Sequence, residues 1–212
     1  MKPILLHLSF LMLLTVSASA QADQEAQKIL DRFSANALGA PSISMKFNLI
    51  TLDQAENTKD TIEGSIILSK DKYNLELPDN TIWFNGETSW SYLPAEKEVT
   101  ITKPDKKDNS FQNKPSLIFS MYKKGYKSRL IEEKADSWII DLYPEDIKSD
   151  LLRVRLLIGK SLLNLKSLEY KKKDGVVITL NVIDYNLKQK PVAETFVYPS
   201  AKFKGVEIID MR

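Results

Sequence analysis

Cysteine is absent from the 212-residue sequence, and histidine occurs once, at His7. Without cysteine the chain has no disulfide, no thiolate metal site and no cysteine nucleophile. Glycine is also scarce, with seven residues, and none of them has the spacing of a phosphate-binding or dinucleotide-binding loop. These absences exclude several large classes of enzyme.

The charge of the chain is balanced, with 30 Lys and Arg residues against 28 Asp and Glu residues and a net charge of +2. A protein whose main partner is nucleic acid usually carries a clear excess of positive charge. The basic runs at residues 106–107, 123–124 and 171–173 each adjoin a turn or an acidic residue, so we interpret them as solvated turns. We therefore expect no nucleic-acid partner.

The first twenty residues have the pattern of a secretory signal peptide. Lys2 precedes an apolar run over residues 4–16, and Ala18-Ser19-Ala20 forms a small-residue cleavage site. The run is too short to span a bilayer comfortably, and no later stretch approaches about 20 apolar residues. We expect cleavage at about Ala20/Gln21, with residues 21–212 exported as one domain. No cysteine follows the site to carry a lipid, so we expect that domain to be soluble.

Cleavage would also remove His7, so histidine-dependent serine triads and ordinary zinc sites would be unavailable. Carboxylates are the remaining candidates for acid–base chemistry, in principle as a glycosidase-like pair: Glu63, Glu76, Asp79 and Glu87. Nothing in the sequence pairs any two of them, and the usual proton-transfer side chain is missing. We expect a protein without enzymatic activity, metal or cofactor.

Two segments have the pattern of helices. The first begins after Asp23, a suitable N-cap, and ends at Gly39-Ala40-Pro41. Its apolar residues recur at helical spacing: Ala26, Ile29, Leu30, Phe33 and Ala37. The second is a short apolar segment from Pro115 to about Gly125, in which apolar and polar residues do not alternate.

Elsewhere apolar residues alternate with polar ones, which is typical of strands with one apolar face. Asn85-Gly86 and Asp174-Gly175 are strong hairpin signals. The alternating segments lie at residues 43–49, 62–68, 73–77, 90–92, 99–101, 138–142, 154–158, 176–182, 196–198 and 206–209, and a continuous apolar run at 82–84 leads into Asn85-Gly86 as a further strand. We predict a mainly β fold with short helices (α+β), with about nine to eleven antiparallel strands. A sheet of that length should curl, because twist accumulates from strand to strand, and the helices would cover its concave apolar face.

Aromatic residues fall on several predicted strands: Trp83, Trp90, Tyr92, Trp138 and Tyr143. Each could fill a core or line a pocket for an apolar ligand. Periodicity alone does not separate these two roles.

The order of these signals, from about Asp23 to Asp210, resembles the periplasmic outer-membrane lipoprotein carrier family, LolA. The most specific stretch runs from Trp83 to Pro94, where a hairpin glycine is followed by an aromatic–polar–aromatic sequence and a turn. Further similar segments are residues 98–101, 115–119, 196–199 and 205–210.

The resemblance implies a strongly curved, half-open sheet, an incomplete barrel, with a helical lid over a cavity for the acyl chains of lipoproteins. An inner-membrane ABC transporter would release these lipoproteins to the carrier, and an outer-membrane acceptor would receive them; the carrier would be a monomer. The expected cavity wall comprises Met45, Phe47, Leu49, Ile66, Leu68, Leu75, Trp90, Tyr92, Ile140 and Leu142. The expected lid comprises Ile29, Phe33, Leu117, Ile118 and Phe119.

One position departs from the family pattern. Members often place an arginine at the end of the strand that residues 64–69 match, where it holds the lid shut. Lys70 stands there, and lysine lacks the planar five-donor guanidinium. Lys70 could therefore lock the lid or be a solvated lysine of the turn, and both interpretations stay open. Two other hypotheses for the whole chain also stay open. The first is a lipid-binding or envelope-stress sensing module without a transport role, and the second is a filled β domain.

Overall fold

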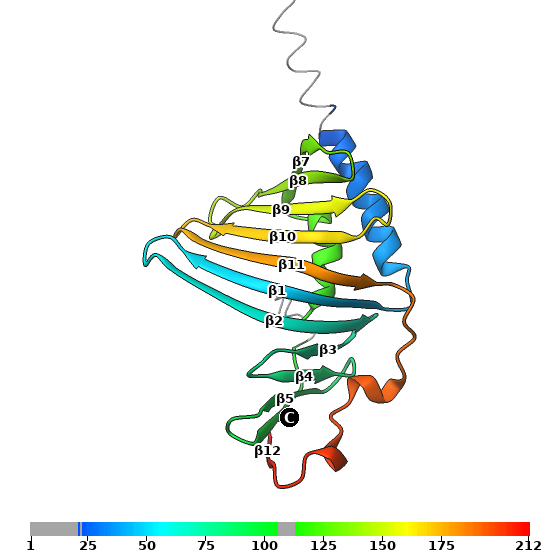
Figure 1. Ribbon diagram of the computed structural model, residues 1–212, viewed down its shortest axis with the longest axis vertical. Helices are drawn as coiled ribbons and strands as arrows, with labels where there is room; N and C mark the ends of the chain where they lie inside the picture. Colours follow the sequence, from blue (N-terminus) through cyan, green and yellow to red (C-terminus); the bar gives the residue numbers. More distant parts are fainter. Residues whose placement is uncertain (1–20, 22, 106–112) are drawn as a thin grey trace, which may run out of the picture.

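The computed structural model describes residue 21, residues 23–105 and residues 113–212 of the chain. The expected signal peptide and most of the charged segment at 103–114 lie outside these residues. The described residues form one twelve-stranded sheet, curved and not closed, with the helix over residues 23–38 beside it (Figure 1). In this part of the chain, no helix has the length and apolar character needed to cross a membrane.

The strands follow the spatial order β12-β6-β5-β4-β3-β2-β1-β11-β10-β9-β8-β7. Every neighbouring pair is antiparallel except β12 and β6, which are parallel. Their bounds are β1 (Ile43–Asp53), β2 (Thr58–Ser69), β3 (Lys72–Glu76), β4 (Thr81–Phe84), β5 (Ser89–Leu93), β6 (Glu98–Thr102), β7 (Tyr126–Glu133), β8 (Ser137–Pro144), β9 (Leu151–Gly159), β10 (Leu165–Lys172), β11 (Val176–Asn186) and β12 (Glu207–Asp210).

The count exceeds the nine to eleven strands expected because two strands carry weak sequence patterns. β7 is an edge strand rich in charged residues, and β10 contains a register shift between Leu165 and Ser167 that breaks the alternation. The strand expected at 196–198 is wrong. Phe196 ends the 3-10 helix η3 (Ala193–Phe196), and Tyr198 packs on the sheet instead of pairing with it.

Alternation along the strands divides the sheet into a concave inner face and a convex outer face. Met45 is paired with Ile66, and Ile66 with Leu75, so these side chains share the inner face. The inner face carries the main core, which extends across the sheet to Ile140, Leu142, Val154, Leu156, Ile158, Leu165 and Leu168, all at most 1% exposed.

The helix over residues 23–38 buries its predicted stripe, including Ile29 and Phe33, in that core. It ends as expected at Gly39, whose N–H donates to the carbonyl of Ala35 at 3.0 Å. A side chain at Gly39 would come within 2.7 Å of that carbonyl oxygen. The Asn36 side chain donates to the carbonyl of Leu162, which holds the helix beside the turn between β9 and β10.

The second expected helix is two short 3-10 helices, η1 (Pro115–Phe119) and η2 (Met121–Lys123). Pro115 begins η1, as predicted from its fixed φ angle. At Ser120 the backbone leaves helical geometry with φ −136°, and its N–H donates to the carbonyl three residues back, at Leu117. We call residues 115–123 the lid segment; Figure 1 shows it on the far side of the sheet, over the inner face.

The outer face of β4, β5 and β6 has a core of its own. Trp83, Val99 and Ile101 are buried there with Tyr198, from the segment that follows β11. Phe203 stacks on Tyr198, with ring centroids 5.3 Å apart, and contacts Trp83 at 5.9 Å. The chain then passes η4 (Ser200–Lys202) and adds β12 to the edge of the sheet. β4 therefore has apolar side chains on both faces, because Ile82 and Phe84 pack against the main core on the inner face.

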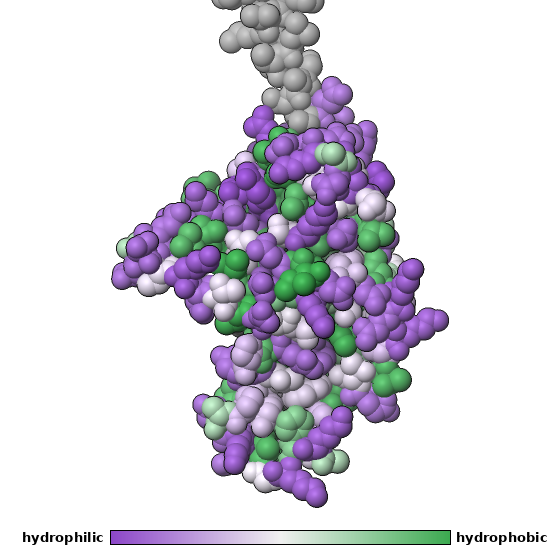
Figure 2. Space-filling model, viewed as in Figure 1, coloured by the Kyte–Doolittle hydropathy of each residue, from purple (hydrophilic) through white to green (hydrophobic). Residues whose placement is uncertain are grey.

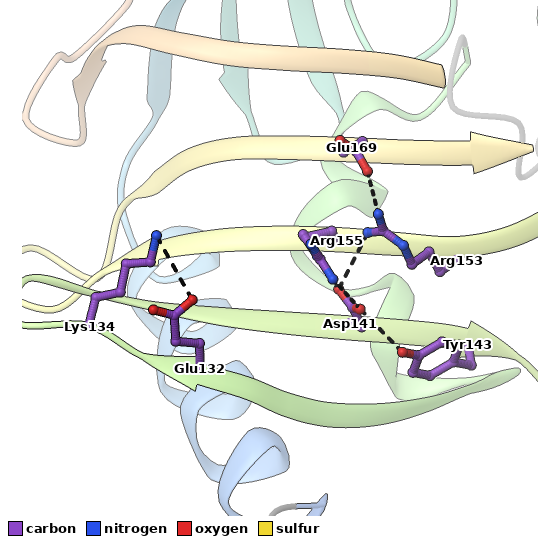
Figure 3. Close-up of polar contacts among 7 residues, drawn as sticks. All are labelled: Glu132, Lys134, Asp141, Tyr143, Arg153, Arg155 and Glu169. Atoms are coloured by element: carbon purple, nitrogen blue, oxygen red, sulfur yellow. Dashed lines mark hydrogen bonds and ion pairs between the residues drawn. The ribbon is translucent and has the colours of Figure 1, made fainter. Parts of the chain in front are cut away.

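The outer face of β8, β9 and β10 carries a polar cluster built on Asp141 (Figure 3). Asp141 is 1% exposed and accepts two hydrogen bonds from Arg155, at 2.7 and 2.8 Å. Tyr143 donates to it at 3.2 Å, and Arg153 links it to Glu169, which accepts at 2.8 Å. Hydrogen bonding to Asp141 raises the pKa of Arg155. A buried carboxylate thus joins three strands on a face that is otherwise largely hydrophilic (Figure 2).

Asp141→Asn should lower the free energy of unfolding by about 2 kcal/mol, because it removes the charge that both arginines neutralise. The midpoint of urea unfolding measures this loss. Glu133→Gln is the control, since Glu133 forms an ion pair with Lys160 at the surface and should change the midpoint little. An Asp141→Asn protein with the wild-type midpoint would show that the cluster contributes nothing to stability.

Candidate functional site

A cavity of about 820 Å³ lies between the lid segment and the inner face of the sheet. Its sheet side is formed by side chains of β1, β9, β10 and β11, and its other side by η1 and η2. The lining is predominantly aliphatic and aromatic: Leu49, Leu117, Ile118, Ser120, Met121, Lys124, Tyr126, Leu151, Leu168, Tyr170, Lys172, Ile178 and Leu180.

Strand pairing places the sheet residues of this lining next to one another. Leu180 of β11 is the Cα partner of Leu49 on one side and of Leu168 on the other. Ile178 is likewise the partner of Tyr170. Directly opposite residues project from the same face, so the three strands present one continuous apolar wall.

The polar groups of the cavity are few. The Tyr170 hydroxyl lies 3.8 Å from the sulfur of Met121, and burial raises the pKa of Tyr170. Burial also raises the pKa of Tyr126. Both phenols are therefore neutral near pH 7. Lys124 and Lys172 add positive charge to the lining. The Lys172 ammonium lies 3.6 Å from the Asp150 carboxylate and 3.7 Å from the Asp174 carboxylate.

Two contacts fasten the lid segment to the helix. The rings of Phe119 and Phe33 lie 5.5 Å apart between centroids. The Tyr122 hydroxyl donates to the Asp31 carboxylate at 2.7 Å. Burial, together with this hydrogen bond, raises the pKa of Tyr122 to about 12. We call these two contacts the lid clasp.

The expected lid residues are brought together: Ile29 and Phe33 on the helix, and Ile118 and Phe119 on η1, share one core. Leu117 and Ile118 also line the cavity. Of the expected wall residues, Leu49 lines it. Most of the others lie on the inner face but in packed core, at most 5% exposed: Met45, Phe47, Ile66, Leu68, Ile140 and Leu142. Leu75 is partly buried against the same core.

Trp90 and Tyr92 were expected beside these residues, and the structure places them elsewhere. Trp90 is the partner of Trp83, and Tyr92 is the partner of Val99, on the outer face. Both pack against the outer cluster, and the Tyr92 ring lies 4.6 Å from that of Phe203. The register of β3, β4 and β5 sets this face, because a shift of one residue moves every side chain to the other side.

Lys70 is exposed in the turn between β2 and β3, with φ +55°. Within the described ranges, no hydrogen bond or ion pair connects its ammonium to the lid segment. The contacts that fasten the lid segment in the structure are those of the lid clasp, to Asp31 and Phe33 of the helix.

Several lining residues were not among those expected. Ile178 and Leu180 belong to a predicted strand, so their alternation could have identified them. Leu168 and Tyr170 could not be found this way, because the irregular β10 was not predicted. Met121 and Tyr126 enter the site through the lid segment and the edge strand. Among the residues that the structure describes, no cluster of three His, Cys, Asp or Glu side chains could hold a metal ion.

Comparison with known proteins agrees with this architecture. A family model described as outer membrane lipoprotein carrier protein LolA matches residues 16–160. An uncharacterised conserved protein from Thermus thermophilus has a TM-score of 0.58 at 14% identity, over 88% of this chain and 99% of that one. Its likeness supports the fold.

Two further structures are more distant. A LolA superfamily protein from Nitrosomonas europaea has a TM-score of 0.42 at 14% identity, covering 82% of this chain and 98% of its own. The lipoprotein LppX of Mycobacterium tuberculosis has a TM-score of 0.41 at 13% identity, covering 78% of this chain and 97% of its own. No curated protein sequence matches.

Tyr122→Phe should lower the free energy of unfolding by about 1 kcal/mol, by removing the hydrogen bond to Asp31. The folded pKa of Tyr122, about 12, lies above the ordinary value of 10.0, so its contribution is complete below pH 10 and is lost as the pH rises through about 12. Urea unfolding of both proteins over this range measures the difference.

The ultraviolet absorbance of tyrosinate gives a second readout. One phenol of the wild type should ionise near pH 12, and this step should be missing in Tyr122→Phe. Asp31→Asn should lower the pKa of Tyr122 only in part, since burial is the larger cause of its shift. An unchanged titration in Tyr122→Phe would contradict the burial and bonding assigned to this residue.

Proposed function

The chain belongs to the family of outer membrane lipoprotein carrier proteins, LolA, and on that premise we propose that it carries the acyl chains of lipoproteins in the cavity beneath its lid segment. It would take them from the inner membrane and deliver them to the outer membrane. The observation that carries this proposal is the 820 Å³ apolar cavity itself.

The size and lining of the cavity support an apolar guest. Ligand sites in proteins commonly measure about 300–1,000 Å³ and are mostly hydrophobic, with a few polar groups. Each buried methylene contributes about 0.8 kcal/mol, so an acyl chain cannot cross an aqueous compartment without cover. The leucines and isoleucine of β1, β10 and β11 supply that cover, and the charged residues of the described lining are Lys124 and Lys172.

The lid clasp supports reversible loading. The hydrogen bond and the aromatic pair of the clasp contribute about 1 kcal/mol each. The lid segment otherwise buries only three large side chains in the core, Ile118, Phe119 and Tyr122. The lid segment consists of two short 3-10 helices. Opening it should therefore cost far less than unfolding the sheet, as a carrier that must release its cargo requires.

The remaining parts of the proposal concern the cell. Residues 1–20 would direct export, and residues 21–212 would act in the periplasm as one monomeric domain. An inner-membrane ABC transporter that releases lipoproteins would supply the cargo, and an outer-membrane acceptor would take it. The same cavity in a lipid-sensing module would bind acyl chains without passing them on.

Leu180→Trp should narrow the cavity at its sheet wall and weaken binding of a fluorescent fatty-acyl probe about tenfold or more, since about two methylenes of contact would be lost. Leu162→Trp is the matched control, because Leu162 is 66% exposed in the turn between β9 and β10. Fluorescence titration of the wild type and both variants measures the affinities.

The length of the fatty acid gives an independent test of binding in the cavity. The affinity of the wild type for fatty acids should rise about fourfold per added methylene until the cavity is full. Probe binding that is absent, or that is equal in Leu180→Trp and the wild type, would contradict an acyl site in this cavity. Binding without transfer of a lipoprotein to outer-membrane vesicles would favour the sensing module.

A further inference from the structure

A second cavity, of about 650 Å³, lies on the other side of the lid segment. Among the residues that the structure describes, none lines both cavities: Leu117 and Ile118 line the first, whereas Pro115 and Ser116 line the second. The turns between β2 and β3 and between β4 and β5, together with the residues after β6, form the rest of the second cavity.

The floor of this second cavity is apolar. Leu68 and Tyr73 are each 3% exposed, and the ring of Tyr73 lies 5.4 Å from that of Phe84. Pro104 and Pro115 complete the apolar part of the lining. An alkyl or similar apolar group would find the same kind of surface here as in the first cavity.

The rim differs from that of the first cavity because its described residues include four lysines: Lys70, Lys72, Lys103 and Lys114. Among these described residues the carboxylates are Asp71, Glu87 and Asp105, so this part of the lining carries one more lysine than carboxylates. Lys103 is paired with Glu87 at 2.8 Å.

Lys70 and Lys72 have no ion-pair partner among the residues that the structure describes. The turn that bears them is fixed: Lys70 adopts φ +55°, and the Ser69 hydroxyl donates to the carbonyl of Pro41 at 3.0 Å. The stem of Lys72 passes close to Gly86, where an added Cβ would lie 3.9 Å from the Lys72 Cγ. Two lysines without an ion-pair partner among the described residues thus stand at the rim of an apolar pocket.

We propose that this second cavity is a binding site for an amphiphile with a phosphate head group. The apolar part would lie on Leu68, Tyr73 and Phe84, and the ammonium groups of Lys70 and Lys72 would donate hydrogen bonds to the phosphate oxygens. Such charge-assisted bonds are the stronger class of hydrogen bond, and lysine is a common phosphate ligand. This proposal does not depend on acyl binding in the first cavity.

The test is calorimetric titration with dodecyl phosphate, dodecyl maltoside and inorganic phosphate. The protein is the full domain carrying Leu180→Trp, which should weaken binding in the first cavity and lies outside the lining of the second. Dodecyl phosphate should bind. Lys70→Gln/Lys72→Gln in the same background should weaken that binding about tenfold or more. Lys59→Gln/Lys188→Gln, an equal change of charge at two exposed positions, should not.

The other two probes separate the parts of the ligand. Equal affinity for dodecyl maltoside would mean that the phosphate is not recognised, and would overturn the proposal. Inorganic phosphate binding as tightly as dodecyl phosphate would show a plain anion site and would contradict the role of the apolar floor. Equal binding of dodecyl phosphate by both double variants would show that Lys70 and Lys72 do not bind the phosphate, and would contradict the proposal. None of these results bears on acyl binding by the wild type.

Discussion

The structure depends on the burial of one continuous apolar face of the sheet, which the helix and the lid segment cover only in part. Twelve strands twist and curve, and the concave face that results is larger than one helix and a short lid segment can fill. Where the helix lies, Phe33, Ile140 and Leu156 pack to full burial. Where only the lid segment lies, a cavity is left. The packed part supplies stability, and the unfilled part supplies the binding site.

The outer face of the sheet carries two stabilising clusters, whereas the inner face carries the cavity. The outer face of β8 to β10 is held by the Asp141 cluster, and the outer face of β4 to β6 by the aromatic cluster around Trp83. Neither uses the inner face, which stays available for a guest. The lid clasp also avoids the cavity wall, because Tyr122 and Phe119 turn toward the helix while Leu117 and Met121 face the cavity. Lid movement can therefore alter access without disturbing the strands.

Much of the fold could be predicted from local pattern. Period-two alternation identified most strands, and the stripe from Ala26 to Ala37 identified the helix, because both patterns arise from burial of one face. The site was harder. Ile82, Trp83 and Phe84 are consecutive apolar residues, which indicates that both faces of β4 are covered, but the face that Trp90 and Tyr92 occupy depends on turn register. Ile140 lies in packed core and Leu180 in the cavity wall because the helix covers only part of the inner face. The local sequence pattern does not show which part the helix covers.

The central claim is that an acyl chain lies between the lid segment and the wall formed by Leu49, Leu168 and Leu180. Intermolecular nuclear Overhauser effects, measured between the methylenes of a bound fatty acid and the methyl groups of the protein, test it most directly. The account predicts such effects to Leu49, Ile118 and Leu180, and none to Leu142 or Leu156 in the packed core. A bound chain that contacts neither Ile118 nor Leu180, or a fatty acid that shows no contact with any inner-face methyl group, would contradict it.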